Sequence, residues 1–149
     1  MKRRTILIVA LIIGALCCMP SCKKRIEWCY YEEYHYINNS SYEISITAFN
    51  KIDSIWYAET YHIGINEQFS QEIEFNSGSS TGIIALCDSV KVIYGNERVS
   101  HLVFDSISPY NILRLENYDT VQISNNRRSN TYTFTINDYQ NANDISADE

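Results

Sequence analysis

The chain has few basic residues, few histidines and little helical patterning. Of its 149 residues, 12 are Lys or Arg, 18 are Asp or Glu and three are His. Nucleic-acid binding needs a basic footprint, so this balance argues against a nucleic-acid partner. The histidines, at positions 35, 62 and 101, are far apart, and no H-E-x-x-H motif or closely spaced cysteine pair accompanies them. The sequence therefore predicts no metal site and no cofactor.

The chain also has no apolar run that would make a comfortable membrane span. The run from Ile6 to Met19 is too short, follows the positive residues Lys2–Arg4 and ends in Pro20-Ser21-Cys22. A positive start, a short apolar core and a small residue at the end are typical of a secretory signal. Residues 1–21 are therefore predicted to be a signal peptide of the bacterial lipoprotein kind.

Cys22 is the predicted lipid-attachment site. Ser21 supplies the small residue before it and Met19 the apolar residue three positions earlier, whereas Cys17 and Cys18 have less suitable neighbours. An ordinary cleaved signal without a lipid is the alternative. Cleavage before Cys22 leaves 128 residues with nine basic and 18 acidic side chains, a net charge of −9. We expect anchorage to the outer membrane through this lipid, with residues 22–33 as the lipidated N-terminus and tether.

The rest of the chain shows the period-two alternation of half-buried strands. Tyr132, Phe134 and Ile136, for example, alternate with threonines. Seven to nine strands are expected, at about 34–38, 42–49, 54–58, 61–66, 71–76, 82–94, 97–104, 112–123 and 130–136, with a break allowed at Asp88 in 82–94 and another within 112–123. Many short strands separated by turns predict an all-β domain, an antiparallel Ig-like or transthyretin-like sandwich. Its expected limits are residues 34–142, with one helical turn at 138–142 and a flexible polar tail at 143–149.

Breaker residues separate the predicted strands. Asn38–Ser41 precedes the strand at 42–49, and Gly95-Asn96 lies between two apolar runs. Because glycine comes first, the Gly95-Asn96 pair predicts a two-residue hairpin with a type II′ turn. Gly78–Gly82 matches the G-x-S-x-G motif of α/β-hydrolases, but the residues that follow read as a strand rather than the required helix, so we interpret it as a loop.

Two cysteines remain beyond the predicted lipid site. Cys29 and Cys87 could form a disulfide in an oxidising compartment. Cys87 also ends an apolar run, Ile83–Leu86, so a buried thiol is the alternative.

The segment from Trp28 to Tyr36 is unusually aromatic, with five aromatic side chains among nine residues. Such side chains present flat faces with polar tips, which suit contact with sugars, partner proteins or lipid headgroups. The alternative is an edge strand in which every second residue packs inward. The candidate binding surface consists of Trp28, Tyr30, Tyr31, Tyr34 and Tyr36.

Several of these features together resemble a known group of proteins. Besides the signal, they are the turn Asn38–Ser41 leading into Tyr42–Phe49, the strand Asp88–Val92 with its hairpin, and Tyr132–Ile136 followed by Asp138-Tyr139. In this combination the chain resembles small envelope lipoproteins of Bacteroidetes. The resemblance implies an envelope location and a β fold, not an activity.

Four tripeptides also resemble the D-[ST]-apolar O-glycosylation signal of Bacteroidetes envelope proteins. The candidate acceptor hydroxyls are Ser54, Ser89, Ser106 and Thr120. The geometric alternative is that Asp-Ser and Asp-Thr pairs form turns before an apolar residue opens a strand.

No catalytic constellation is visible in the sequence. Glu72 and Glu74 share the wet face of one predicted strand, where like charges are usually solvated, and no nucleophile has a recognisable base. We therefore expect a non-enzymatic envelope lipoprotein, a binding or accessory module that contacts protein or glycan. A fimbria-like structural subunit that assembles by strand exchange is the alternative, and an unpaired first or last strand would favour it.

Overall fold

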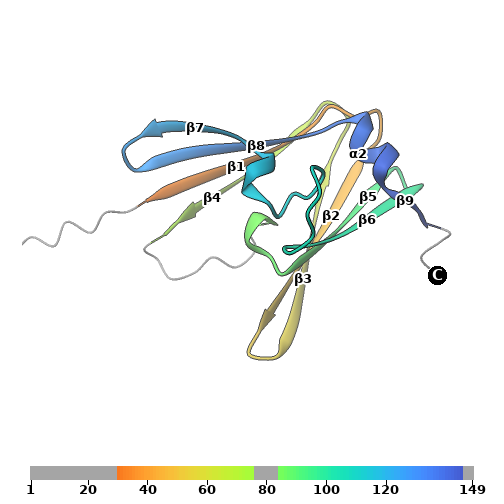
Figure 1. Ribbon diagram of the computed structural model, residues 1–149, viewed down its shortest axis with the longest axis horizontal. Helices are drawn as coiled ribbons and strands as arrows, with labels where there is room; N and C mark the ends of the chain where they lie inside the picture. The colour runs from red at the N-terminus through yellow and green to blue at the C-terminus, as the bar shows by residue number, and fades with distance from the viewer. Residues whose placement is uncertain (1–29, 76–83, 146–149) are drawn as a thin grey trace, which may run out of the picture.

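The computed structural model describes residues 30–75 and 84–145, which form two packed β-sheets (Figure 1). Sheet A has the strand order β4 (Gln68–Glu74), β1 (Tyr31–Asn38), β8 (Arg127–Phe134) and β7 (Asp119–Ser124). Sheet B has the order β3 (Ile55–Ile63), β2 (Ile44–Ile52), β5 (Ser89–Tyr94), β6 (Arg98–Val103) and β9 (Asn143–Asp144). The predicted all-β sandwich of seven to nine strands is confirmed.

Helical structure is limited to short connecting pieces. The described residues contain two 3₁₀ turns, η1 (Ile84–Leu86) and η2 (Leu115–Asn117), and one helix, α2 (Ile136–Asn141). Thr135 caps α2, since its hydroxyl accepts from the Asn137 N–H while Asp138 accepts from the Thr135 N–H at 2.8 Å. This reciprocal arrangement is a capping box, and it explains why a single helical turn forms where the sequence predicted one. No described segment is a helix long and apolar enough to cross a membrane.

One strand pair departs from the predicted antiparallel arrangement. β1 pairs with β4 in the antiparallel sense and with β8 in the parallel sense, from Tyr31 opposite Arg127 to Asn38 opposite Phe134. The first and the last long strands therefore lie side by side in the middle of sheet A (Figure 1). The other strand pairs among the described residues are antiparallel.

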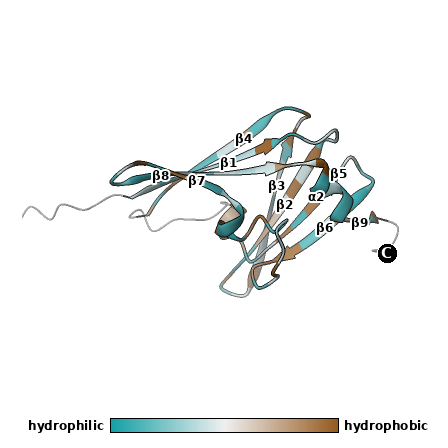
Figure 2. Ribbon diagram, turned by 45° about the horizontal axis from the view of Figure 1, so that its top comes forward, coloured by the Kyte–Doolittle hydropathy of each residue, from teal (hydrophilic) through white to brown (hydrophobic). Residues whose placement is uncertain are grey.

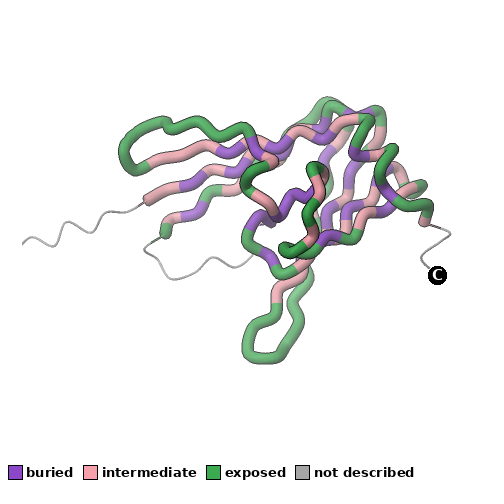
Figure 3. The backbone as a smooth tube through the Cα atoms, viewed as in Figure 1, coloured by how far each residue is buried: buried purple, intermediate pink, exposed green. Residues whose placement is uncertain are grey.

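The core between the sheets is rich in tyrosine. Five tyrosines are buried, and they pack edge-to-face or tilted against one another and against Phe134, namely Tyr34, Tyr36, Tyr94, Tyr118 and Tyr132. Buried phenols need partners. The hydroxyl of Tyr118 donates to the Ile112 carbonyl at 2.6 Å, and that of Tyr132 donates to Asp138 Oδ1 at 2.6 Å. Figure 3 shows buried positions alternating with partly exposed ones along strands of both sheets.

Asn38 joins the two sheets at the turn that the sequence predicted. Its side chain is fully buried, and its Nδ2 donates to the carbonyls of Tyr42, Ile63 and Gly64 at 2.8, 3.2 and 3.1 Å. Its Oδ1 accepts from the N–H and the hydroxyl of Ser40 at 3.0 and 2.6 Å. One amide thus ties the end of β1 to the start of β2 and the end of β3.

A second asparagine orders the long irregular segment 104–118. Asn111 Nδ2 donates to the carbonyls of Val103 and Ser106 at 2.9 and 2.8 Å, and Oδ1 accepts from the Leu113 N–H at 3.0 Å. Buried backbone groups need hydrogen-bond partners. In this segment no neighbouring strand supplies them, and the Asn111 side chain does so instead. Leu113 is thereby held in the core. The segment 112–123, for which the sequence allowed a break, is a strand only in its second part, because only Asp119–Ser124 is extended and paired.

Other predicted boundaries also need correction. The segments 54–58 and 61–66 are one continuous strand, β3, because no turn residue interrupts its pairing with β2. The segment 82–94 is a strand only from Ser89, since η1 precedes it. β1 begins at Tyr31, inside the predicted tether, and β9 lies inside the predicted tail at Asn143–Asp144.

The predicted hairpin at Gly95-Asn96 is present with a different turn. The Glu97 N–H donates to the Tyr94 carbonyl at 3.0 Å, and Gly95 and Asn96 have φ values of +56° and +59°. Two positive φ values are the mark of type I′, so the type II′ prediction is wrong. Asparagine tolerates the left-handed region, which lets it follow the glycine there.

Candidate functional site

The outward-facing surface of sheet B is the candidate binding surface. Along β2, the inward residues Ile44, Ile46 and Ala48 are buried, while the residues between them are partly exposed. Hydrophobic and hydrophilic residues alternate in the same way along neighbouring strands (Figure 2). We call the following outward positions the sheet-B face: Ser45, Thr47, Phe49 and Lys51 of β2, Trp56, Ala58, Thr60 and His62 of β3, Ser89, Lys91 and Ile93 of β5, and His101 and Val103 of β6. Val99, the next outward position of β6, is 1% exposed and is not part of this surface.

Strand register arranges the polar side chains of this face in a row. Thr60 is opposite Thr47, Thr47 is opposite Lys91, and Lys91 is opposite His101. Directly opposed side chains on one sheet face are close enough to interact. The Thr47 and Thr60 hydroxyls are 3.0 Å apart, forming a hydrogen bond across β2 and β3. The row is therefore an ordered line of two hydroxyl groups, an ammonium group and an imidazole across four strands.

An exposed tryptophan extends the face toward the tip of the β2–β3 hairpin. Trp56 is 58% exposed, and the Lys51 ammonium lies 5.7 Å from its ring centroid. The turn that closes this hairpin is Asp53-Ser54, with φ values of +49° and +70°. Figure 1 shows the hairpin projecting from the sandwich, with β3 as the edge strand of sheet B.

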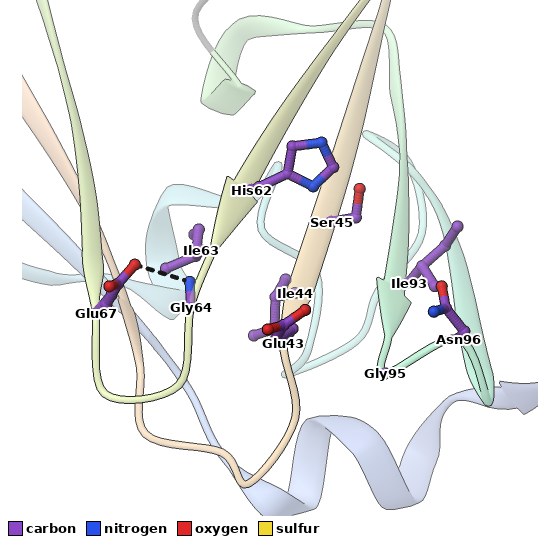
Figure 4. Close-up of a pocket in the computed structure, with 10 residues that line it drawn as sticks. All are labelled: Glu43, Ile44, Ser45, His62, Ile63, Gly64, Glu67, Ile93, Gly95 and Asn96. Carbon is purple, nitrogen blue, oxygen red and sulfur yellow. Dashed lines mark hydrogen bonds between the residues drawn. The ribbon is translucent and has the colours of Figure 1, made fainter.

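A pocket of about 450 Å³ lies at the opposite end of the face (Figure 4). His62 and Ser45 line it from adjacent strands, and Glu43 and Glu67 approach it from the connecting segments. Glu67 Oε2 accepts from the Gly64 N–H at 3.2 Å, which fixes that carboxylate at the rim. Ser45 is directly opposite His62, and Figure 4 draws no hydrogen bond between these two side chains.

The outward surface of sheet A differs from the sheet-B face because its charged side chains pair with one another. Arg127 forms ion pairs with Glu33 and with Glu72, the latter at 2.8 Å. The guanidinium of Arg127 lowers the pKa of the Glu33 carboxyl below its usual value. His35 is on the same surface, hydrogen-bonded through Nδ1 to the Ser70 hydroxyl at 2.8 Å. These side chains satisfy one another.

The aromatic segment that the sequence offered as a binding surface is mostly structural. Tyr34 and Tyr36 face inward and are 0% exposed, so their prediction as surface residues is wrong. They are buried because β1 is a central strand with one face on the core, not an edge strand. Tyr30 and Tyr31 are half-buried, and the Arg128 guanidinium covers the Tyr30 ring at 5.6 Å. Trp28 lies outside the described residues.

The predicted cysteine chemistry falls mainly outside the described residues. Cys22 and Cys29 both lie there, so the lipid site and the Cys29–Cys87 disulfide stay predictions. Cys87 is buried, as the alternative interpretation expected, and Asn50 Nδ2 donates to its sulfur at 3.2 Å. Burial raises the pKa of the Cys87 thiol, which disfavours the reactive thiolate.

The four candidate glycosylation hydroxyls occupy different environments. Ser54 is exposed in the turn of the β2–β3 hairpin, whereas Ser89 and Ser106 are half-buried. Thr120 is in β7, and its hydroxyl donates to Asn130 Oδ1 at 2.9 Å. Ser54 and Thr120 are thus the two exposed acceptors, and modification at all four positions stays a prediction.

Within residues 30–75 and 84–145, no group of three or more His, Cys, Asp or Glu side chains could hold a metal ion. The sequence did not identify the sheet-B face. Alternation marked Ser45 and Thr47 as the wet side of a strand, but nothing in the sequence showed which strands would lie beside them. No family model, curated protein or solved structure matches this chain.

Proposed function

We propose that the protein is a non-enzymatic envelope lipoprotein that binds glycan through the sheet-B face. The observation that supports this most is the line of hydroxyl and cationic side chains on an exposed sheet surface, next to the exposed ring of Trp56. Sugars offer hydroxyl groups for hydrogen bonds and apolar ring faces for contact with an aromatic side chain. The sheet-B face presents partners for both.

Replacement of Trp56 tests the binding surface. Trp56→Ala should weaken retention on immobilised envelope glycans by about tenfold, the size expected when a central aromatic contact is truncated. Because Trp56 is 58% exposed, the melting temperature should change little. Phe104, an aromatic residue outside the face and 61% exposed, gives the matched control Phe104→Ala, which should retain binding. Equal binding by both variants and the unmodified protein would exclude this surface.

We further propose anchorage through a lipid on Cys22, in the outer membrane. The supporting features are the positive residues Lys2–Arg4, the apolar run that follows and the small residue before Cys22. Cys22→Ser should abolish fatty-acid labelling and membrane retention, whereas Cys29→Ser should keep both. Continued labelling of Cys22→Ser would move the attachment site to Cys17 or Cys18.

Strand exchange and hydrolysis receive less support. β1 and β8 are each paired on both sides, so neither long terminal strand of the described domain is unpaired. The pocket brings Ser45, His62 and Glu67 near one another, but Glu67 is hydrogen-bonded to the backbone, and Figure 4 draws no hydrogen bond between Ser45 and His62. Neither alternative has a contact in its favour.

A further inference from the structure

The described cations fall into two groups. All four described arginines form ion pairs: Arg98 with Asp144, Arg114 with Glu116, Arg127 with Glu33 and Glu72, and Arg128 with Glu32. The two described lysines, Lys51 and Lys91, both lie on the sheet-B face, and neither forms an ion pair with a described residue. The cations left without a carboxylate are thus together on one surface.

That surface also has no acidic side chains. None of the 13 positions of the sheet-B face is Asp or Glu, although the chain has 18 acidic residues and residues 22–149 have a net charge of −9. On sheet A, the outward positions include Glu33, Glu72, Glu74 and Asp119. Carboxylates of described residues are found only at its borders, where Asp88 accepts from the Lys51 backbone N–H at 2.7 Å and Glu43 and Glu67 line the pocket. In an acidic protein, a sheet surface whose own positions bear two lysines and no carboxylate is complementary to negative charge.

We infer that the ligand of the sheet-B face is an anionic polysaccharide, one that bears carboxylate or sulfate groups along a hydroxyl-rich chain. This inference rests on the proposed glycan-binding function. Lys91 is in the same row as Thr47 and Thr60. When an acidic group of the polysaccharide contacts the Lys91 ammonium, the hydroxyl groups of the neighbouring sugar lie beside the two threonines. The same row of side chains therefore recognises both the acidic groups and the hydroxyl groups of the polysaccharide.

The spacing of the lysines suits separated charges. Lys91 is opposite Thr47, which lies four residues before Lys51 in β2. Four residues of strand span about 13 Å, so the two ammonium groups contact different acidic groups of one chain. Nucleic acid has a much denser line of charge, which the overall negative charge of the protein repels. A glycan with intermittent acidic groups fits this surface better.

The pocket end of the face sets the position of the ligand. Glu43 and Glu67 approach the pocket there, and their carboxylates repel acidic groups while accepting hydrogen bonds from sugar hydroxyls. The acidic sugars therefore lie toward Lys91 and Lys51, and neutral sugar units lie toward the pocket. The described face thus orients the polysaccharide as well as binding it.

Matched pairs of polysaccharides test the inference with the purified protein. Polygalacturonate and its methyl ester differ in carboxylate charge, and dextran sulfate and dextran differ in sulfate charge. Binding is measured by affinity electrophoresis or calorimetry at two salt concentrations. We expect at least one charged member to bind more tightly than its neutral partner and to weaken as salt rises. The pair that shows the difference identifies carboxylate or sulfate as the recognised group.

Two substitutions at one exposed site separate charge from shape. Ala58 is an exposed position of the face on the edge strand β3. Ala58→Glu should weaken binding of the charged polysaccharide, whereas Ala58→Gln, of nearly the same size, should bind like the unmodified protein. Lys91→Gln should lower affinity about fivefold, as expected for one exposed ion pair. Arg114→Gln removes the same charge away from the face and should have little effect.

The outcomes distinguish this inference from the function on which it rests. Equal binding of charged and neutral members, with loss in Trp56→Ala, would overturn the anionic ligand and leave glycan binding in place. No binding to any of the four polysaccharides would overturn both. Equally tight binding of single-stranded DNA would show that charge alone is recognised, and would overturn the assignment to polysaccharide.

Discussion

Raising the pH above about 10 is expected to unfold this domain steeply. An unfolded tyrosine has a pKa near 10. In the folded domain, burial raises the pKa of all five core tyrosines, Tyr34, Tyr36, Tyr94, Tyr118 and Tyr132. Below pH 10 the folded and the unfolded protein both keep these protons, so the tyrosines do not change the free energy of unfolding. Above it the unfolded state releases them while the folded state does not, so the free energy of unfolding falls.

The size of this effect follows from the number of protons. Each proton that only the folded state retains lowers the free energy of unfolding by about 1.4 kcal/mol per pH unit. For five tyrosines, the free energy of unfolding therefore falls with a slope approaching about 7 kcal/mol per pH unit. Urea midpoints measured across this range report the loss, and tyrosinate absorbance should rise together with unfolding. Tyr94→Phe removes one titrating group and should make the slope shallower by about one fifth, or about 1.4 kcal/mol per pH unit. A midpoint that stays constant well above pH 10 would contradict this account.

Asn38→Asp is expected to be the most damaging near-isosteric substitution. The Asn38 amide donates to three backbone carbonyls, and a carboxylate oxygen in its place would face all three without a proton to share. A buried charge without a partner typically costs about 3–5 kcal/mol, a large part of a small domain's stability. Urea unfolding near neutral pH measures the loss.

The neighbouring residue provides the control for this substitution. Asn39 is exposed, and the structure uses only its backbone N–H, which donates to the Phe134 carbonyl at 2.9 Å. Asn39→Asp should therefore change stability by no more than about 0.5 kcal/mol. Similar stability of the Asn38 and Asn39 variants would show that the Asn38 amide does not hold the sheets together.

Alternation predicted the strands because one face of each is buried. It found only residues 34–38 of β1 and missed its start at Tyr31, where the inward positions include Glu32 as well as Tyr34 and Tyr36. Polar side chains on the buried face hide the usual pattern. Glu32 is tolerated there because Arg128 and the Tyr34 hydroxyl surround it, at 3.3 and 2.5 Å. The Arg128 contact depends on β8, far along the chain, and no local pattern reports it.

The candidate site was not visible in the sequence for a similar reason. Lys51 and Lys91 become members of one surface only because β2 and β5 are neighbours in sheet B. The missing ion pairs are equally a property of the fold, since the sequence places Lys51 only two residues from Asp53. Composition therefore gave the overall negative charge but not its uneven distribution.

The parallel pairing of β1 and β8 also determines how the domain bears mechanical load. The chain enters the described domain at the start of β1 and leaves it after the end of β8, with α2 and the two-residue β9 beyond. A pull on the two ends first detaches those short elements, and then slides β1 and β8 past each other along their length. Their hydrogen bonds run between the strands and are loaded together, so they must break together rather than one by one.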